Sequence, residues 1–260
     1  MKYRLTLKAL RSHLACALLV LGTITLSNSV FAQEHTAMPA PKVIIFDVNE
    51  TLLDLAPLRG SVDQALQGRE DLLPLWFSTM LHYSLVDTLS NDYHDFGQIG
   101  AAALMMVAEA QGIEVTPEQA RKAIVETITK LPAYPDVAPS LQALKDKGYK
   151  IVSLTNSSNK GVAAQFEHAG LTQYFEHRYS VEDVQAFKPD ARTYEWVLEE
   201  LGVAPEEVLM VAAHAWDLAG AKAVGLQTAF IQRPGTVLYP LTARPDYVVQ
   251  NLAQLLDHLK

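Results

Sequence analysis

Several polar residues that could do chemistry follow short apolar runs in this chain. Asp47 directly follows the run Val-Ile-Ile-Phe at residues 43–46. A carboxylate at the end of a buried strand is poorly solvated and can act as a nucleophile, although a single aspartate there is more often a helix cap. The other polar residues of this kind are Thr155, Asn156, Lys188, His214 and Asp217. The whole set favours a catalytic site over an isolated cap.

The elements that must position these residues alternate between strand and helix. Apolar runs at 43–46, 151–154, 208–211 and 229–231 indicate buried parallel strands. Helical patterns between the later runs end at Gly148, Gly170, Gly202 and Gly225. This alternation predicts an α/β fold with a doubly wound, Rossmann-like parallel sheet, built from residues 41–55 and 135–260. Because ligands of such sheets bind beyond the carboxyl ends of the strands, the polar residues are expected to converge there.

The segment between the first two apolar runs does not follow this alternation of strand and helix. Residues 56–134 are too many for a loop, and Trp76, Phe77 and Met80 follow helical spacing. Thr116-Pro117 is typical of a helix start. We therefore expect an all-helical cap domain inserted after the first strand.

Composition and charge narrow the classes of function. Of 260 residues, 49% are apolar and 19% are charged, which indicates a folded chain. The net charge of −8 disfavours a nucleic acid partner, because like charges repel. Cys16 is the single cysteine, which excludes a disulfide scaffold and a cysteine-rich metal site.

The first 32 residues have the pattern of a secretory signal peptide. Four basic residues precede an apolar run at 14–26, and Val30-Phe31-Ala32 precedes Gln33. A membrane anchor is the alternative, but the run is shorter than the ~20 residues that span a bilayer. We expect a secreted, periplasmic protein that has no membrane segment after cleavage.

Four segments of the chain resemble the motifs of the haloacid dehalogenase superfamily. They are residues 46–52, 153–156, 187–189 and 214–217, in the superfamily's order and at suitable spacing. Trp216-Asp217 and the segment from Trp76 to Tyr83 are similar to the L-2-haloacid dehalogenases in particular. The resemblance implies the same sheet, a helical cap and a homodimer.

The resemblance also implies roles for the residues in these segments. Asp47 would attack the carbon that bears the halogen, Lys188 would orient its carboxylate, and Asp217 would pair with Lys188. Thr51 would hydrogen-bond Asp47, and the substrate would bind at Val48, Asn49, Thr155 and Asn156. A structural Lys188–Asp217 ion pair and a helix-capping Thr51 remain open as alternatives.

Two positions separate this chain from the superfamily's magnesium phosphatases. Those enzymes carry an aspartate where this chain has Asn49, and usually an acidic residue where it has Ala213. An asparagine cannot act as a general acid, and an alanine cannot ligate Mg²⁺. We therefore expect no metal and no cofactor.

Other departures set this chain apart from the L-2-haloacid dehalogenases. The arginine that usually follows the cap tryptophan is Phe77 here, and Glu50 and His214 replace uncharged residues. We interpret Glu50 and His214 as a dyad in which His214 activates water. The alternative is that His214 donates only to the departing halide. Phe77, Phe96 and Trp216 are expected to form an apolar wall around the carbon–halogen bond.

Together these patterns predict hydrolytic dehalogenation of short L-2-haloacids, with inversion, through an ester on Asp47. A magnesium-dependent phosphatase of the same fold is one alternative, and it predicts turnover of p-nitrophenyl phosphate. A non-catalytic periplasmic carboxylate-binding protein is the other, and it predicts binding without halide release.

The mature protein is predicted to begin at Gln33. N-terminal sequencing of the protein purified from its native host checks this prediction. Residues 1–32 still attached to the exported protein would refute cleavage at this position.

Overall fold

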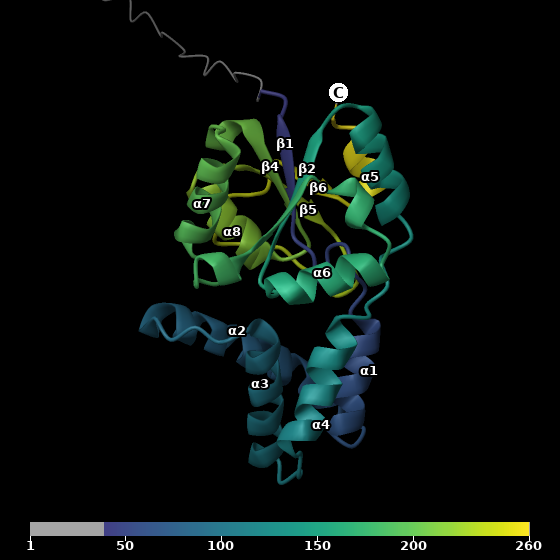
Figure 1. Cartoon of the computed structure of the whole chain (residues 1–260), viewed down its shortest axis with the longest axis vertical. Coiled ribbons are helices and arrows are strands. Elements are labelled where there is room, and N and C mark those ends of the chain that lie inside the picture. Colours follow the sequence, from purple (N-terminus) through teal and green to yellow (C-terminus); the bar gives the residue numbers. More distant parts are fainter. Residues whose placement is uncertain (1–38, 260) are drawn as a thin grey trace, which may run out of the picture. The chain divides into compact units, whose positions relative to one another are not determined.

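The structure is a computed structural model that describes residues 39–259. The expected signal peptide, residues 1–32, lies outside the described residues. A six-stranded, all-parallel sheet forms the centre, in the order β3-β2-β1-β4-β5-β6 (Figure 1). Its strands are β1 (Val43–Phe46), β2 (Lys150–Thr155), β3 (His177–Ser180), β4 (Val208–Ala212), β5 (Gln227–Ile231) and β6 (Tyr247–Val249). The expected doubly wound α/β sheet is confirmed.

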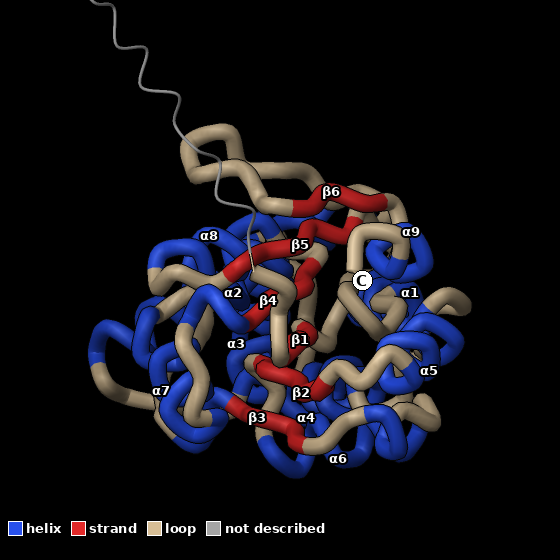
Figure 2. Tube along the Cα trace, turned by 90° about the horizontal axis from the view of Figure 1, so that it is seen from above, coloured by secondary structure: helices blue, strands red, loops and turns tan. Residues whose placement is uncertain are grey.

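Helices cover both faces of the sheet, as Figure 2 shows. One face carries α7 (Ala191–Leu201) and α8 (Ala215–Ala223), and the other carries α5 (Val137–Asp146), α6 (Asn159–His168) and α9 (Leu252–Leu256). Short helical turns are η3 (Thr172–Tyr174), η4 (Val181–Asp183) and η5 (Pro205–Glu207). Two covered faces explain why β1 and β4 are apolar at every position rather than at alternate ones.

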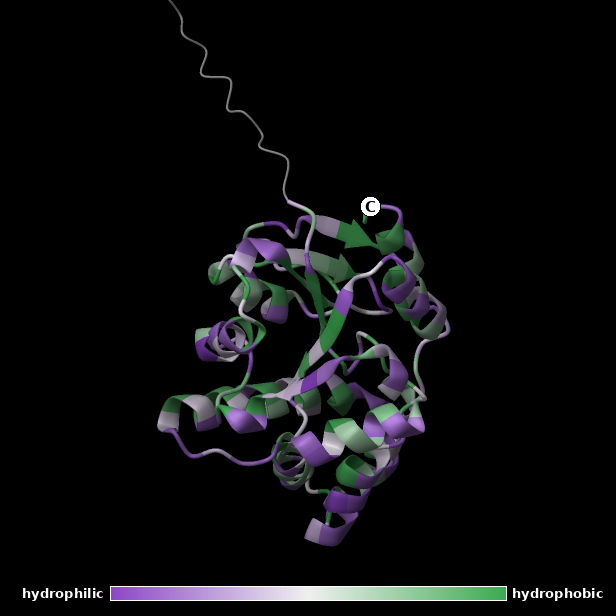
Figure 3. Cartoon of the chain, turned by 45° about the horizontal axis from the view of Figure 1, so that its top comes forward, coloured by the Kyte–Doolittle hydropathy of each residue, from purple (hydrophilic) through white to green (hydrophobic). Residues whose placement is uncertain are grey.

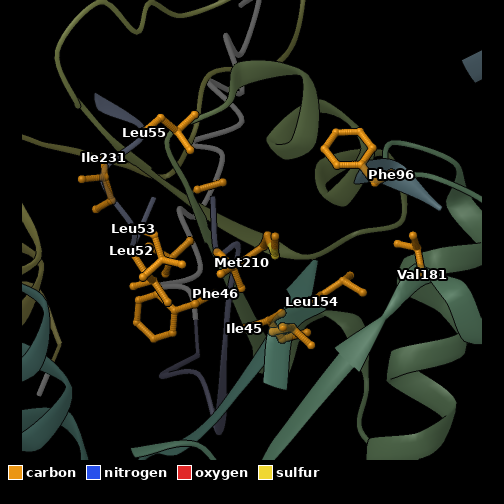
Figure 4. Packing of buried hydrophobic residues seen from close by; sticks show 14 of the residues in the cluster. Ile45, Phe46, Leu52, Leu53, Leu55, Phe96, Leu154, Val181, Met210 and Ile231 are labelled. Carbon is orange, nitrogen blue, oxygen red and sulfur yellow. The ribbon is translucent and has the colours of Figure 1, made fainter. Parts of the chain in front are cut away.

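The core lies where the central strands meet these helices. Ile45, Leu154 and Met210, from β1, β2 and β4, are fully buried and lie close together in Figure 4. Figure 3 shows the same contrast over the described residues, with hydrophobic strands inside and hydrophilic helix faces outside. Burial of this apolar surface is the main force that holds the sheet and helices together.

The sequence patterns missed the two edge strands. β3 carries the polar sequence His-Arg-Tyr-Ser, and β6 is the short apolar run Tyr-Val-Val, which was not predicted as a strand. An edge strand has a neighbour on one side only and does not need the apolar composition of a central strand. The helices that were predicted to end at glycines do end there. For example, Gly202 closes α7 with a φ of 63° and donates its N–H to the carbonyl of Leu198.

The chain between β1 and β2 is helical and lies beyond the carboxyl ends of the strands (Figure 1). Its elements are α1 (Ala56–Ala65), η1 (Glu70–Leu72), α2 (Leu73–Ser90), α3 (Phe96–Ala110), α4 (Pro117–Arg121) and the π-helical turn η2 (Lys122–Glu126). Thr116 and Gln119 cap α4 reciprocally, and Trp76 Nε1 joins α2 to α3 by donating to Gly100 O at 2.9 Å. We refer to residues 56–134 as the cap.

The two connections into the cap run beside each other. Leu53 and Ala133 form an antiparallel bridge, and Asp54 N donates to Pro132 O at 2.8 Å. Arg233, directly after β5, donates to Thr51 O at 3.1 and 2.9 Å and to Asp136 Oδ1 at 2.9 Å. The start and the end of the cap are therefore tied to the same edge of the sheet.

No helix within residues 39–259 is both long and apolar enough to span a bilayer.

Gly220 in α8 permits a close approach that a side chain would block. A Cβ there would lie 2.6 Å from Pro189 Cβ, 2.7 Å from Pro189 O and 2.8 Å from Tyr194 Cε2. We expect Gly220→Ala to destabilise the protein by about 1–3 kcal/mol, because well-packed interiors resist added atoms. The measurement is thermal or urea unfolding.

Gly60→Ala in α1 is the matched control. A Cβ at Gly60 meets nothing within 4 Å, so the higher helix propensity of alanine should stabilise this variant by about 0.5–1 kcal/mol. Equal unfolding midpoints for the two variants would contradict the packing argument.

Candidate active site

The site forms where the order of the sheet reverses. β1 lies between β2 and β4, so the residues that follow these three strands meet at one edge. They are Asp47 after β1, Asn156 after β2 and His214 after β4. Asp47 N donates to Val211 O at 3.0 Å, which extends the sheet pairing to the carboxylate-bearing residue.

The Asp47 carboxylate is buried and held by three donors. Lys188 Nζ lies 2.9 Å from Oδ1, while Thr51 Oγ1 at 2.7 Å and His214 Nδ1 at 3.1 Å both face Oδ2. Thr51 Oγ1 accepts from Ala213 N at 2.8 Å, which leaves its hydroxyl hydrogen for Asp47. Burial alone would raise the pKa of Asp47, but the charge of Lys188 and the bond from His214 hold it well below its usual range. Asp47 is therefore an ionised carboxylate at neutral pH.

Each of the three N–H groups of the Lys188 ammonium has a hydrogen-bond acceptor. Its Nζ donates to Asp47, to Asp217 Oδ2 at 2.5 Å and to Leu154 O at 2.9 Å. Burial opposes the charge of the ammonium, yet the two carboxylates outweigh it and raise the pKa of Lys188. Asp217 is held in turn by Tyr194, whose hydroxyl donates to Oδ1 at 2.7 Å. Lys188 therefore fixes the Asp47 carboxylate and has no N–H left for a ligand.

His214 bridges two carboxylates. Its Nδ1 faces Asp47, and its Nε2 lies 3.0 Å from Glu50 Oε2. The imidazole is stacked between Phe77 and Trp216, with ring centroids 6.2 and 5.0 Å away. Burial lowers the pKa of His214, but the bonds to Asp47 and Glu50 outweigh burial and raise it to about 9. At neutral pH the resting imidazole is thus a cation that donates from both nitrogens.

Glu50 occupies a strained backbone conformation. Its φ of 63° is in the left-handed region, which costs a residue with a side chain about 1–2 kcal/mol. The carboxylate also forms an ion pair with Arg59 of α1, whose side chain is half exposed. Such a strained backbone conformation persists only where the surrounding structure holds it, and residues in such conformations are common at functional sites. Here it aims the Glu50 carboxylate at the His214 ring.

A small chamber adjoins the Asp47 carboxylate. This reaction chamber has a volume of about 30 Å³, and its lining residues are all buried or half-buried. They are Asp47, Asn49, Leu55, Phe77, Leu81, Phe96, Asn156, His214 and Trp216.

Asn156 offers this chamber a free donor. Its Oδ1 accepts from Lys188 N at 3.1 Å, while the buried Nδ2 has no partner within residues 39–259. An unsatisfied buried donor is costly, and a bound anion would satisfy it. Asn49 is already paired, because Nδ2 donates to Ser157 Oγ at 3.1 Å and Oδ1 accepts from Gln165 Nε2 at 2.8 Å.

Of the seven residues expected to bind the substrate, five line the chamber and two do not. Val48 is fully buried and accepts backbone bonds from Leu52 and Leu53. Thr155 is also fully buried, and its Oγ1 accepts from Ser157 N at 3.1 Å. The side chains of both residues therefore do not line the chamber.

Sequence reasoning missed two residues of the network. Tyr194 fitted the helical pattern of α7, so nothing marked it as the partner of Asp217. Arg59 lies nine positions beyond Glu50 in a different element, and only the fold brings the two side chains together. The six-residue spacing from Lys188 to Tyr194, on the helix that follows the lysine loop, was the one available signal.

Among residues 39–259, no group of three or more His, Cys, Asp or Glu side chains is arranged to hold a metal ion.

Comparison with known proteins identifies the family. Residues 41–225 match the family of haloacid dehalogenase-like hydrolases. This chain belongs to that family.

Related haloacid dehalogenase-like hydrolases cover most of the chain. It is 33% identical to the (S)-2-haloacid dehalogenase of Pseudomonas sp. (strain YL), over 83% of this chain and 93% of the relative. It is 29% identical to haloacetate dehalogenase H-2 of Moraxella sp. (strain B), over 80% of this chain and 93% of the relative.

A solved structure has the same fold. The L-2-haloacid dehalogenase from Xanthobacter autotrophicus aligns with a TM-score of 0.76 at 28% identity, over 83% of this chain and 96% of that chain. A second structure of that enzyme holds covalently bound chloropropionic acid, with the same TM-score and identity.

The charge state of His214 provides a test of this geometry. We expect its imidazole to titrate with a pKa of about 9, measured by nitrogen-15 NMR, with the signal assigned through His214→Ala. In Asp47→Asn the pKa should fall, because the charge that favours the imidazolium is gone. Since the folded-state pKa exceeds the usual 6.5, the site stabilises the fold fully below pH 6.5 and loses this contribution as the pH rises through about 9.

Asp71→Asn, which changes a fully exposed carboxylate, is the control and should leave the pKa of His214 unchanged. An identical pKa in Asp47→Asn and the unmodified protein would contradict the proposed contact.

Proposed function

We propose that this protein hydrolyses short L-2-haloacids to 2-hydroxy acids with inversion. One observation carries the proposal: a buried, ionised Asp47 carboxylate, fixed by Lys188, lines a small chamber. Binding alone needs no nucleophile of this kind, which argues against a carboxylate-binding protein. The names of the related enzymes support the same reaction.

The first step is displacement at carbon. An Asp47 oxygen forms a bond to the α-carbon as the carbon–halogen bond breaks, and the halide leaves with the bonding electrons. Attack opposite the leaving group inverts that carbon. Because Lys188 and Thr51 each hold an oxygen of the carboxylate, the nucleophile is positioned before the substrate arrives.

The chamber offers separate surfaces to the two ends of the substrate. The free Asn156 Nδ2 and the backbone around Val48 and Asn49 suit an anionic group, either carboxylate or departing halide. Phe77, Phe96 and Trp216 supply an apolar wall beside it. Exclusion of water by such a wall strengthens the electrostatic interactions inside.

The second step uses His214 as a base that becomes available when the ester forms. While Asp47 is charged, the imidazole is a cation and cannot accept a proton. Esterification removes the Asp47 charge, which lowers the pKa of His214 and releases its proton with the halide. Nδ1 then faces the ester carbonyl and can deprotonate a water there, while Glu50 holds Nε2–H.

Collapse of the resulting tetrahedral species regenerates the starting site. The alkoxide of the hydroxy acid leaves and takes the proton from His214. The carboxylic acid that remains on Asp47 then gives its proton to His214, which restores the Asp47 carboxylate and the imidazolium. The net reaction consumes one water and releases the hydroxy acid, a halide and a proton.

The state of Asn49 disfavours the phosphatase alternative. Phosphoryl transfer in this superfamily would need a proton donor at this position. The Asn49 amide is instead held by Ser157 and Gln165 and carries no acidic proton.

We also propose that the protein is exported and works as a homodimer. The α2 helix is apolar on its outer side as well, and it exposes Leu75, Tyr83, Leu85, Val86 and Leu89. A helix that is apolar around its circumference suits burial against a second copy.

Trapping of the ester tests the two-step scheme. His214→Ala should release up to one equivalent of bromide from bromoacetate and then stall, because attack needs Asp47 but hydrolysis needs the base. Intact-protein mass spectrometry should find a carboxymethyl adduct on Asp47. Asp47→Asn should give neither halide nor adduct, because an amide is a far weaker nucleophile.

His168→Ala, which removes an exposed histidine at the end of α6, is the control and should turn over normally. Glu50→Gln should slow the second step without blocking it. Steady turnover by folded His214→Ala would remove the base role, and loss of both burst and adduct would move His214 to the carbon–halogen step.

A further inference from the structure

An ion pair joins the cap to the loop that carries Glu50. Arg59 lies near the start of α1, in the cap, while Glu50 lies in the turn that follows β1. The side chain of Glu50 is 7% exposed, and that of Arg59 is 50% exposed. Arg59 therefore brings a positive charge from the surface to a carboxylate that has little contact with water.

Glu50 uses a separate oxygen for each of its two charged partners. Its Oε1 accepts from Arg59 Nη2, and its Oε2 lies 3.0 Å from His214 Nε2. Within residues 39–259, these are the two cationic side chains that contact the Glu50 carboxylate. The guanidinium is always charged, whereas an imidazole gains and loses its charge. The two partners therefore differ in what they can do for Glu50 during a reaction.

Formation of an ester would leave Arg59 as the remaining cation beside Glu50. In the proposed mechanism, His214 loses a proton once Asp47 is an ester, and the imidazole is then neutral. A buried carboxylate that has no cationic partner is costly, and it can become neutral by taking up a proton. Because the charge of Arg59 is permanent, it can keep Glu50 an anion while His214 is neutral.

The charge of Glu50 decides which nitrogen of His214 is free to act as a base. A neutral imidazole has one N–H and one acceptor nitrogen, and the hydrogen bond made by one nitrogen fixes the state of the other. An anionic Glu50 can only accept, so it holds the hydrogen on Nε2 and leaves Nδ1 without one. Nδ1 faces Asp47, 3.1 Å from Oδ2, on the side where water must attack the ester.

We propose that Arg59 is a positioning residue for hydrolysis of the ester on Asp47. It acts through Glu50, because it keeps that carboxylate charged and directed at His214 Nε2, and Nδ1 then accepts the proton of the attacking water. The inference rests on the proposed dehalogenase function and assigns a residue to its second step. The first step needs no base, so attack by Asp47 does not depend on Arg59.

Direct binding of the anionic substrate is the alternative role for Arg59. The side chain lines a hollow of about 590 Å³ together with His214 and Trp216. Glu50 and Glu70 line the same hollow, and their negative charges oppose an anion there. A role in hydrolysis and a role in binding affect different steps, so kinetics can separate them.

The experiment measures the two steps separately in Arg59→Met with bromoacetate. Rapid-quench measurements should find an unchanged rate for the first burst of bromide. Ester hydrolysis should slow by roughly 10- to 100-fold, which is less than the 100- to 10,000-fold that a general base itself supplies. Once hydrolysis limits turnover, kcat and KM fall together and kcat/KM is unchanged. Intact-protein mass spectrometry should then find the carboxymethyl adduct during turnover.

Three further variants test whether the effect belongs to the charge of Arg59 and passes through Glu50. Arg59→Lys keeps a positive charge and should restore most of the hydrolysis rate. Arg69→Met is the matched control and should behave as the unmodified protein, because Arg69 is also a half-exposed cap arginine that pairs with an acid, Asp71. In a Glu50→Gln background, Arg59→Met should add no further loss, because no carboxylate is left for the arginine to act on.

The outcomes distinguish failure of this inference from failure of the proposed function. Absence of bromide release by the unmodified protein would overturn the proposed function and this inference with it. If bromide is released, normal ester hydrolysis in Arg59→Met, or an equal further loss in the Glu50→Gln background, would overturn the role of Arg59 alone. A slower burst and a higher KM with normal hydrolysis would assign Arg59 to substrate binding instead. If thermal unfolding shows that Arg59→Met does not fold, Arg59→Gln replaces it in every comparison.

Discussion

The buried ammonium of Lys188 is the interaction on which the rest of the site depends. It is fully enclosed and touches two carboxylates and a backbone carbonyl. Removal of one partner from such a pair costs about 3–5 kcal/mol, because an uncompensated charge then stays buried. The arrangement therefore makes the Asp47 carboxylate both ionised and immobile, and leaves substrate binding to other groups. The cap takes part as well, because Thr88 of α2 accepts from Phe187 N, next to the lysine.

A second series of ion pairs leads from the Asp47 carboxylate toward solvent. It runs from Asp47 through His214 and Glu50 to Arg59, and each contact joins opposite charges while the imidazole is protonated. Together with Lys188 and Asp217, the cluster has three anions and three cations, so it is neutral at rest. In the proposed mechanism, an ester on Asp47 would break that balance, and His214 would restore it by losing a proton. The strained backbone of Glu50 is the structural cost of inserting a charged side chain at this turn.

Side chains from both the sheet and the cap line the reaction chamber. Asp47, Asn156 and His214 come from the sheet, while Phe77, Leu81 and Phe96 come from α2 and α3. Neither set of residues forms the chamber alone, so the shape of the space beside Asp47 depends on how the cap helices α2 and α3 meet the sheet.

The sequence by itself determined the central strands of the sheet, the helical insert and the residues that are proposed to react. Continuous apolar runs mark β1, β2 and β4, because only strands covered on both faces tolerate them, and polar residues directly after those runs mark the site. The edge strand β3 was not predicted because its sequence is polar and contains no apolar run. Only the tertiary structure decided which side chains meet across the fold, namely Arg59 with Glu50 and Tyr194 with Asp217. The protonation state of His214 also depends on the tertiary structure. Its pKa depends on distances to two carboxylates far apart in sequence, which no local pattern contains.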